Sequence, residues 1–259
     1  HELRSRFELE AQSTDVLSSP HTVDLYDFVV ASNGDYYYVM ELLDGLDLQS
    51  LVKRYGAVAA ERTVHLLIQA CDSLADAHFR GMVHRDIKPA NIFTCRMGPT
   101  VDFVKVLDFG LVKSFAEPAE RGADLTDDDV VSGTPAFMAP EQLEGGESTP
   151  ATDLYALGCV AYWLLTGTHV FDGATPIKVA LEHLRAIPDP PSVRSELDIP
   201  EALEGIVLDC LEKDPAQRPV SAEELARTLG AVALPTHWDQ DRARAWWDLH
   251  MTPRGSQGS

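Results

Sequence analysis

The chain has 259 residues and carries 41 Asp and Glu against 21 Lys and Arg, which gives a formal charge of −20. Its length fits one large domain or two modest ones, and 45% apolar with 24% charged residues excludes a disordered or collagen-like chain. A strongly acidic surface repels phosphate backbones and anionic lipids, and the sequence has no basic patch. We therefore expect no nucleic acid as a partner and no membrane contact from this segment.

The N-terminal part predicts a helix followed by a hairpin. Residues 3–17 have apolar positions at helical spacing, and Pro20 ends that pattern. Two β-rich runs follow at 25–31 and 35–42, with a Ser-Asn-Gly tripeptide between them. Because Asn-Gly between such runs is the strongest short-range hairpin signal, we expect an antiparallel pair.

A long amphipathic helix and two further strands are predicted next. Residues 62–80 repeat apolar side chains every three or four positions, and Gly81 suits the C-terminal cap of this helix. The strand-like runs 91–95 and 101–107 are joined by a turn that contains Gly98-Pro99. The sequence therefore predicts a second hairpin after the helix.

The C-terminal half is predicted to be mainly helical. Residues 111–150 show little apolar periodicity, and so long a connection in a compact domain usually serves function. After Pro235 the tail carries three Trp residues, which we expect to pack on the larger body. The pattern as a whole predicts two unequal lobes with a cleft between them. Helical patterns occupy 153–166, 176–186, 201–213 and 221–230.

The four cysteines predict a cytoplasmic protein. They lie far apart, have no Cys-x-x-Cys spacing and stand in apolar contexts, as reduced core residues do. The longest apolar run, 154–165, is much shorter than the ~20 residues that a transmembrane helix needs. The cysteines are Cys71, Cys95, Cys159 and Cys210.

One loop concentrates polar groups that can carry out chemistry. Asp86, Lys88 and Asn91 lie within six residues, and Pro89 keeps the loop from being helical, so they can converge. A carboxylate can orient an attacking hydroxyl and accept its proton, and an ammonium group can neutralise a transferring phosphoryl group. The amide oxygen of Asn91 and the carboxylate of Asp108 are hard ligands of the kind that Mg²⁺ prefers. Phosphoryl transfer needs this set of parts.

Five motifs in family order and at family-like spacing resemble the protein kinase superfamily. They are HRDIKPAN at 84–91, DFG at 108–110, SGTPAFMAPE at 132–141, DLYALG at 153–158 and Arg218 in a Gln-Arg-Pro tripeptide. The resemblance implies an α+β, protein-kinase-like two-lobe fold with a mostly helical C-lobe. Only a remnant of the N-lobe, a helix plus a hairpin, is expected. The implied boundaries are 1–43 for that remnant (helix C, two strands and the hinge), 44–235 for the C-lobe and 236–259 for a Trp-containing tail, mobile at its end.

The motifs are similar to those of Ser/Thr kinases. Lys88 follows Asp86 by two positions, Gly133-Thr134 precedes Pro135, and the tail is similar to the end of prokaryotic Ser/Thr kinase domains. The resemblance implies a transferase of bacterial signalling that uses ATP and Mg²⁺. Its substrate would be a Ser or Thr hydroxyl of a protein, with autophosphorylation in trans among its reactions.

The resemblance assigns roles to four residues of the loop and the strand that follows. Asp86 would be the base that orients the acceptor hydroxyl, and Lys88 would clamp the γ-phosphate. Asn91 and Asp108 would be the Mg²⁺ ligands.

The nucleotide-binding residues implied by the same resemblance lie mostly nearer the N-terminus. Met40 falls at the gatekeeper position, and Glu41 and Leu43 would offer hinge backbone groups to adenine. Phe93 would form the floor of the adenine site. Glu10, in the first predicted helix, matches the Glu that pairs with the ATP-binding Lys.

Three residues would be scaffold. Asp153 would cap backbone amides of the catalytic loop from the buried helix, and Glu141 would form a structural ion pair with Arg218.

The resemblance also implies regulatory residues in the segment 108–141. Arg85 would receive a phosphate on Thr126 or Ser132, because a cation beside the catalytic Asp can dock such a group. Thr134 would instead bond the catalytic Asp and Lys directly.

The sequence departs from the family pattern before Glu10. A kinase should have a Gly-rich loop and a strand Lys there, yet the first lysine of this sequence is Lys53. We expect an N-terminally truncated kinase domain that transfers phosphate poorly or not at all by itself. A non-catalytic, kinase-like scaffold that binds protein partners is the alternative. A small-molecule phosphotransferase of the same lineage is disfavoured by the Gly-Thr-Pro and Ala-Pro-Glu tripeptides at 133–141.

Overall fold

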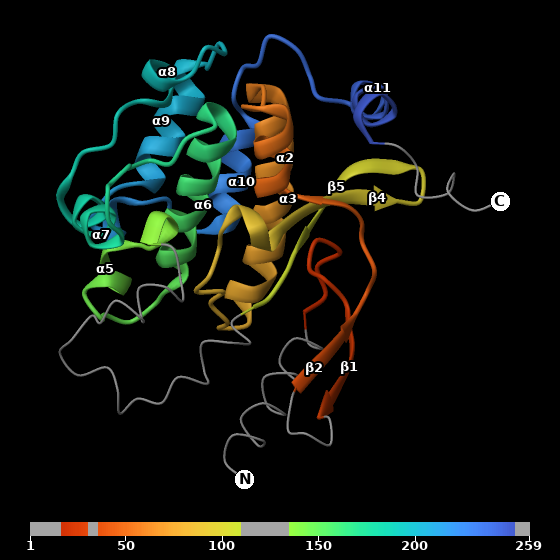
Figure 1. The fold of residues 1–259 in the computed structure, drawn as a ribbon, viewed down its shortest axis with the longest axis horizontal. Coiled ribbons are helices and arrows are strands. Elements are labelled where there is room, and N and C mark those ends of the chain that lie inside the picture. The colour runs from red at the N-terminus through yellow and green to blue at the C-terminus, as the bar shows by residue number, and fades with distance from the viewer. Residues whose placement is uncertain (1–16, 31–35, 110–134, 252–259) are drawn as a thin grey trace.

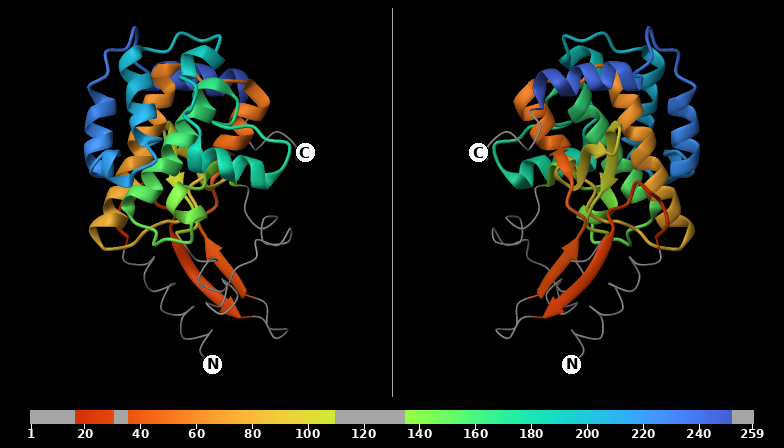
Figure 2. Two further views of the ribbon diagram at one scale, coloured as in Figure 1. Left: turned by 90° about the vertical axis from the view of Figure 1, so that its left-hand side faces the viewer. Right: turned by 90° about the vertical axis from the view of Figure 1, so that its right-hand side faces the viewer.

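The chain folds into a helical body from which a β-hairpin projects (Figure 1). The computed structural model describes residues 17–30, 36–109 and 135–251. The helix predicted at 3–17 falls outside these residues except for Leu17, which is not helical. Both views of Figure 2 show the hairpin extending from the same end of the body.

The predicted N-terminal hairpin is confirmed. Strands β1 (Leu25–Val30) and β2 (Tyr36–Met40) pair antiparallel, with Leu25 opposite Met40 and Val30 opposite Tyr36. Several of its apolar side chains face solvent, and the side chain of Tyr37 is 52% exposed. The described side chains of the hairpin therefore contribute little to the core.

The second sheet has three strands, one more than predicted. Strands β4 (Ile92–Met97) and β5 (Thr100–Val106) form the predicted pair, and β3 (Asp44–Asp47) adds an edge antiparallel to β4. Gly45 makes this addition possible, because a Cβ atom there would collide with the carbonyl oxygen of Thr94. The short strand connects the hairpin to the body.

Two helices form the centre of the body. Helix α6 (Pro150–Thr166) is apolar nearly all round, and all its residues from Thr152 to Thr166 are buried. Helix α3 (Ala60–Phe79) lies between β5 and α10 (Ala222–Gly230), while α9 (Glu201–Cys210) packs on α6. These are four of the predicted helices, and α7 (Pro176–Arg185) is the fifth.

Several shorter elements were not predicted. Helix α2 (Leu48–Tyr55) begins after Asp47, whose Oδ1 accepts a hydrogen bond of 2.7 Å from the backbone N–H of Ser50. The connection predicted at 111–150 contains the turn η4 (Pro135–Phe137) and α5 (Pro140–Leu143), and its residues 111–134 lie outside the described part of the chain. The other additions are η1 (Pro89–Asn91), α8 (Pro191–Arg194), η5 (Pro215–Gln217) and α11 (Gln240–His250).

The Trp-containing tail packs on the body, as expected. Helix α11 lies beside β5, where Asp102 is 1% exposed. The indole Nε1 groups of Trp238 and Trp247 donate hydrogen bonds of 2.8 and 2.6 Å to the Asp102 carboxylate. Arg62 binds both oxygens of the same carboxylate at 2.8 Å, so this buried charge is fully compensated.

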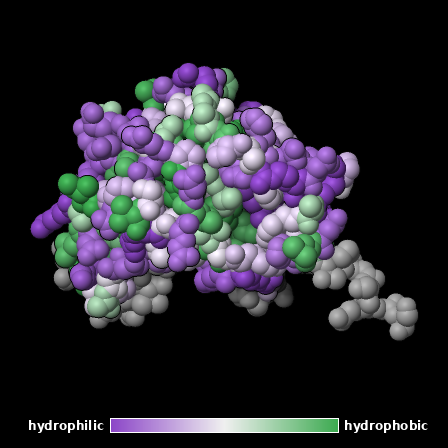
Figure 3. All heavy atoms as spheres, turned by 90° about the horizontal axis from the view of Figure 1, so that it is seen from above, coloured by the Kyte–Doolittle hydropathy of each residue, from purple (hydrophilic) through white to green (hydrophobic). Residues whose placement is uncertain are grey.

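The surface and the cysteines agree with the composition. The face shown in Figure 3 is mostly hydrophilic, with apolar side chains in smaller groups between polar ones. The four cysteines are free and buried. Within the described ranges, no helix combines the length and the apolar character that crossing a bilayer requires.

Candidate active site

Residues 84–91, the predicted catalytic loop, lie between α3 and β4, and α6 holds their backbone. Asp153 is 1% exposed and accepts hydrogen bonds of 2.8 Å from the backbone N–H groups of His84 and Arg85. The Nε2 atom of His78 lies 2.8 Å from the same carboxylate. A buried carboxylate with several donors is well satisfied, and the start of the loop is consequently fixed to the core.

Leu107 joins three segments of the site. Its C=O accepts a hydrogen bond of 2.7 Å from His84 Nε2, and its N–H donates one of 2.8 Å to the carbonyl of Asn91. Burial lowers the pKa of His84, so the imidazole is neutral, with its proton on Nε2. Its Nδ1 then accepts a bond of 3.3 Å from the backbone N–H of Asp86. These hydrogen bonds place Asp86 and Asn91 beside the start of the Asp108-Phe-Gly motif.

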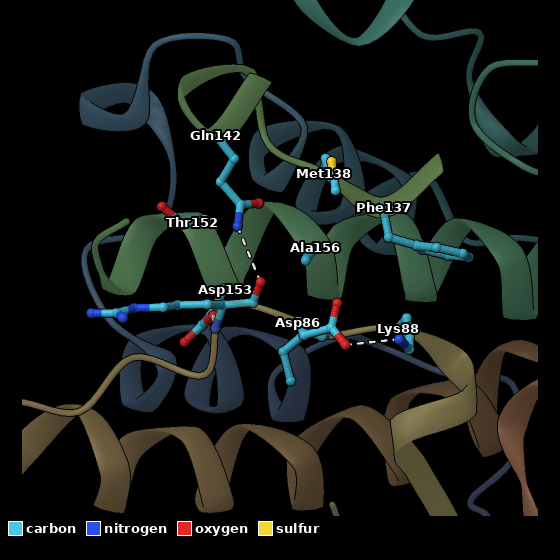
Figure 4. A pocket seen from close by; sticks show the side chains of 10 residues that line it. Asp86, Lys88, Phe137, Met138, Gln142, Thr152, Asp153 and Ala156 are labelled. Atoms are coloured by element: carbon cyan, nitrogen blue, oxygen red, sulfur yellow. Dashed lines mark hydrogen bonds and ion pairs between the residues drawn. The ribbon is translucent and has the colours of Figure 1, made fainter. Parts of the chain in front are cut away.

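Lys88 and Asn91 converge on Asp86. Lys88 Nζ lies 2.7 Å from Asp86 Oδ2, and Asn91 Nδ2 donates to the same oxygen at 3.2 Å. Asn91 Nδ2 also donates to the backbone carbonyl of Asp86 at 2.9 Å. The side chains of Lys88 and Asp86 are 38% and 30% exposed, so they can reach a substrate (Figure 4). The three polar groups predicted to meet therefore do meet.

The residues present fit a magnesium ion bound together with phosphate. Both amide hydrogens of Asn91 point at Asp86, so its side-chain oxygen is the atom that can accept a cation. Asp108 has a left-handed backbone with φ +57°, and the next residue, Phe109, is buried with its ring 4.7 Å from that of His84. Among the described residues no three Asp, Glu, His or Cys side chains form a metal cage. Mg²⁺ in phosphoryl transfer does not need one, because phosphate oxygens and water complete its octahedron.

A buried lysine that is not among the predicted site residues lies next to the expected adenine site. Lys105 on β5 is 3% exposed, and its Nζ lies 2.5 Å from Glu41 Oε1 and 3.1 Å from the carbonyl of Thr22. The same Glu41 oxygen accepts the backbone N–H of Asp24 at 2.9 Å. The sequence signal for a buried Lys105 was its position between apolar neighbours in a predicted strand. Lys105 connects β5 to the segments at both ends of the hairpin.

The other residues expected at the adenine site lie around this cluster. Met40 ends β2 and is 37% exposed, and Leu43 is half-buried between β2 and β3. Phe93 is half-buried on β4, opposite Lys105 in the sheet register. Glu10 lies outside the described residues, as do Thr126, Ser132 and Thr134.

Glu141 and Arg218 form the predicted ion pair, which is bidentate. Arg218 Nη1 and Nη2 each lie 2.8 Å from one oxygen of Glu141, and Thr152 Oγ1 donates to Glu141 Oε1 at 2.8 Å. Burial by itself would raise the pKa of Glu141, but the hydrogen bonds from Arg218 and Thr152, with one from its own backbone, outweigh burial and lower it. The pair connects α5 to η5 and α6.

A pocket opens over Asp86, between the catalytic loop and the segment that leads into α5. Figure 4 shows Asp86 and Lys88 on one side and Phe137, Met138 and Gln142 on the other. The pocket brings the predicted base next to residues of the segment 132–141.

A family model and several curated proteins are similar to this chain. The family model described as protein kinase domain matches residues 2–228. Serine/threonine-protein kinase pkn3 of Myxococcus xanthus is 36% identical over 256 residues, which is 98% of this chain and 45% of that protein. Serine/threonine-protein kinase PknB of Mycolicibacterium smegmatis is 38% identical over 227 residues, 86% of this chain and 35% of that protein. The chain spans less than half the length of these curated relatives.

Solved structures show the same arrangement of elements. The crystal structure of Rad53 1-466 in complex with AMP-PNP has a TM-score of 0.71 at 27% identity, covering 87% of this chain and 54% of that one. The kinase domain of PknI from Mycobacterium tuberculosis has a TM-score of 0.66 at 25% identity, covering 88% of this chain and 79% of that one.

Proposed function

This chain belongs to the protein kinase domain family and has a protein-kinase-like fold, and we propose that it provides the catalytic body of a Ser/Thr protein kinase. The reaction would transfer the γ-phosphoryl group of ATP to a Ser or Thr hydroxyl of a protein. The observation that carries the proposal is the convergence of Lys88 and Asn91 on the carboxylate of Asp86.

That geometry supports the roles proposed for Asp86 and Lys88. Asp86 would orient the acceptor hydroxyl and take up its proton as the oxygen attacks. The ammonium group of Lys88 would neutralise charge on the transferring phosphoryl group. Because Asp153 and His84 hold the loop backbone, both side chains would start close to their working positions, which reduces the entropy lost in reaching the transition state.

ATP and Mg²⁺ are used by the family in general, and we propose specific residues for them here. Asn91 and Asp108 would hold the magnesium ion, which when bound supplies positive charge to the phosphates. Backbone groups of Glu41 and Leu43 would bind adenine, Met40 would be its gatekeeper, and Phe93 would lie under the ring. Support for a nucleotide comes from the similar Rad53 structure, which is a complex with AMP-PNP.

Regulation would act through the loop beside the site. Arg85 would bind a phosphate carried by Thr126 or Ser132, and Thr134 would bond the catalytic loop. The protein partners would be Ser/Thr-containing substrates in the cytoplasm, where ATP is available, and a second copy of the protein in trans.

The proposed lobe boundaries are a small-lobe remnant at 1–43, the C-lobe at 44–235 and the tail at 236–259. The exposed hairpin supports the first boundary. The bonds from the tail to Asp102 support a tail that packs on the C-lobe.

A non-catalytic, kinase-like scaffold that binds protein partners is the second candidate. The 259 residues have no lysine before Lys53, so Glu10 has no lysine near it in sequence to grip the ATP phosphates. We therefore expect this chain alone to bind ATP weakly and to transfer phosphate poorly.

The deciding experiment measures ATP·Mg²⁺ binding by calorimetry for two proteins. One is this chain, and the other is an extended chain that adds the sequence encoded directly upstream. Tight binding and phosphate transfer by the extended chain would support the kinase. Absence of binding by the extended chain would favour the scaffold, while tight binding by the short chain would contradict the expected weak site.

A further inference from the structure

Arg85 has an unusual backbone conformation next to the proposed catalytic base. Its φ angle is +67°, in the left-handed region that residues with a side chain rarely adopt. Such a conformation persists only where surrounding contacts hold it, and these contacts are often part of a functional geometry. Whatever holds Arg85 also sets the direction in which the chain enters Asp86.

The peptide groups on both sides of Arg85 are held by side chains from different elements. Its N–H donates to Asp153 Oδ1 on α6 at 2.8 Å, and its C=O accepts from Gln142 Nε2 on α5 at 3.1 Å. The N–H of Asp86 donates to His84 Nδ1 at 3.3 Å. The peptide group between Arg85 and Asp86 is therefore bonded at both of its polar atoms.

The amide of Gln142 can make its contacts in one orientation only. Its Oε1 accepts the backbone N–H of Ala139 at 3.1 Å, while Nε2 donates to the Arg85 carbonyl. A reversed amide would place oxygen against oxygen and N–H against N–H, so both bonds would be lost. Gln142 is thus a directional bridge between two backbone groups.

The bridge connects Asp86 to the opposite wall of its pocket. Phe137 and Met138 line that wall (Figure 4). Ala139, whose N–H donates to Gln142, is the next residue in the chain. A shift of residues 135–139 would move Gln142 and, through it, the peptide group that precedes Asp86.

We propose that Gln142 is a positioning residue that couples the 135–139 segment to the orientation of Asp86. The proposal rests on the proposed kinase function and assigns Gln142 no contact with the reacting groups. Its bond to Ala139 is sufficient to support the start of α5, since only Oε1 is used there. The donation to Arg85 serves the catalytic loop, and one substitution can remove it alone.

Gln142→Glu is that substitution. A glutamate keeps an oxygen for the N–H of Ala139 but cannot donate to the Arg85 carbonyl, and it places a charged oxygen against that carbonyl. In the extended chain we expect kcat to fall about tenfold, with KM for ATP unchanged. Hydrogen exchange of residues 84–86, followed by mass spectrometry, should become faster.

Gln69→Glu is the matched control. Gln69 also accepts a backbone N–H, that of Val104 at 3.0 Å, and donates to a backbone carbonyl, that of Asp102 at 3.0 Å, but it lies away from the pocket. The same chemical change there should lower the unfolding temperature and leave kcat of the folded protein and exchange at 84–86 as in the wild type.

The outcomes separate this proposal from the proposed function. Unchanged exchange at 84–86 in Gln142→Glu overturns the coupling, as does an unchanged kcat in an active extended chain. Equal losses of kcat in both variants would show a general stability effect and also overturn it. If the extended wild type transfers no phosphate, the kinase proposal fails, and faster exchange confined to Gln142→Glu still supports the coupling.

Discussion

The two sides of the proposed site are built in different ways. The catalytic-loop side consists of residues 84–109. Its backbone is held by hydrogen bonds to the buried Asp153 and by the hydrogen bonds of Leu107. The hairpin side consists of β1, β2 and residues 41–43. Much of its apolar surface faces solvent. This side is attached through Lys105, the backbone bonds of Val106 with His21 and Val23, and β3.

Because of this difference, the residues proposed for phosphate transfer and those proposed for nucleotide binding depend on different contacts. The hydrogen bonds that join Asp86, Lys88 and Asn91 to one another all belong to residues 86–91, so their convergence needs no contact with the hairpin. A two-stranded hairpin is marginal by itself in water, so its position depends on the few bonds that connect it to β5. Substitutions on the two sides should therefore have different consequences.

The largest effect is expected for Asp86→Asn on the catalytic-loop side. Asparagine keeps the shape but cannot take up a proton, so phosphate transfer by the extended chain should fall about 10³-fold, or ~4 kcal/mol of activation free energy. The readout is transfer of labelled phosphate at saturating ATP. The affinity for ATP should stay unchanged, and a parallel loss of ATP binding would contradict the separation of the two sides.

Arg218→Leu should have the next largest effect, on stability. It leaves Glu141 half-buried without its cation and the carbonyls of Glu212 and Ala151 without their donor, at a cost of about 3 kcal/mol. Urea unfolding measures this. The double variant Glu141→Gln with Arg218→Leu removes the uncompensated charge and should regain part of the loss. If the double variant regains no stability, the loss in Arg218→Leu comes from the carbonyl contacts of Arg218 rather than from its ion pair with Glu141.

Lys105→Met tests the connection between the two sides. It removes the buried partner of Glu41, which keeps only the N–H of Asp24, and we expect a loss of about 2–3 kcal/mol. Hydrogen exchange should accelerate in residues 21–24 and 36–41 and stay unchanged in the catalytic loop. Lys105→Met with Glu41→Gln is the neutral control. Equally faster exchange in the catalytic loop would contradict the independence of the two sides.

The regular elements of the body could be predicted because their signals are local. The apolar spacing of α3, the continuous apolar character of α6 and the Asn-Gly pair of the hairpin each lie within one short window. The capped start of α2 was equally local, with Asp47 before it and Gly56 after it, and could have been found.

Other features depend on residues far apart in sequence. The four residues of β3 include Gly45 and two aspartates, a composition typical of a turn, and only pairing with β4 makes them a strand. Three of the residues that donate to Asp102, namely Arg62, Trp238 and Trp247, lie 40 to 145 residues away from it, so no spacing in the sequence indicates them. Gln142 is similar, because its partner Arg85 lies 57 residues away.

The stability of the body should also depend on pH through a buried histidine, a residue type that the hairpin does not contain. His183 on α7 is fully buried, and its Nδ1 lies 2.8 Å from the Tyr155 hydroxyl. Burial and the nearby charge of Lys213 lower the pKa of His183 to about 3. Since the unfolded value is about 6.5, the unfolded state binds more protons between these limits, and stability must fall as pH decreases through that window.

His183→Gln, which cannot titrate, isolates this contribution, the smallest of the four. From pH 7 to pH 5 the wild type should lose about 2 kcal/mol more unfolding free energy than the variant, as measured by urea unfolding at each pH. Three other histidines, the buried His84 and the half-buried His65 and His169, also have pKa values lowered by burial. They remain in both proteins, so their effect cancels in the difference. Equal slopes for the two proteins would mean that His183 becomes protonated in the folded state without cost. The packing of α7 against Tyr155 would then be looser than the structure indicates.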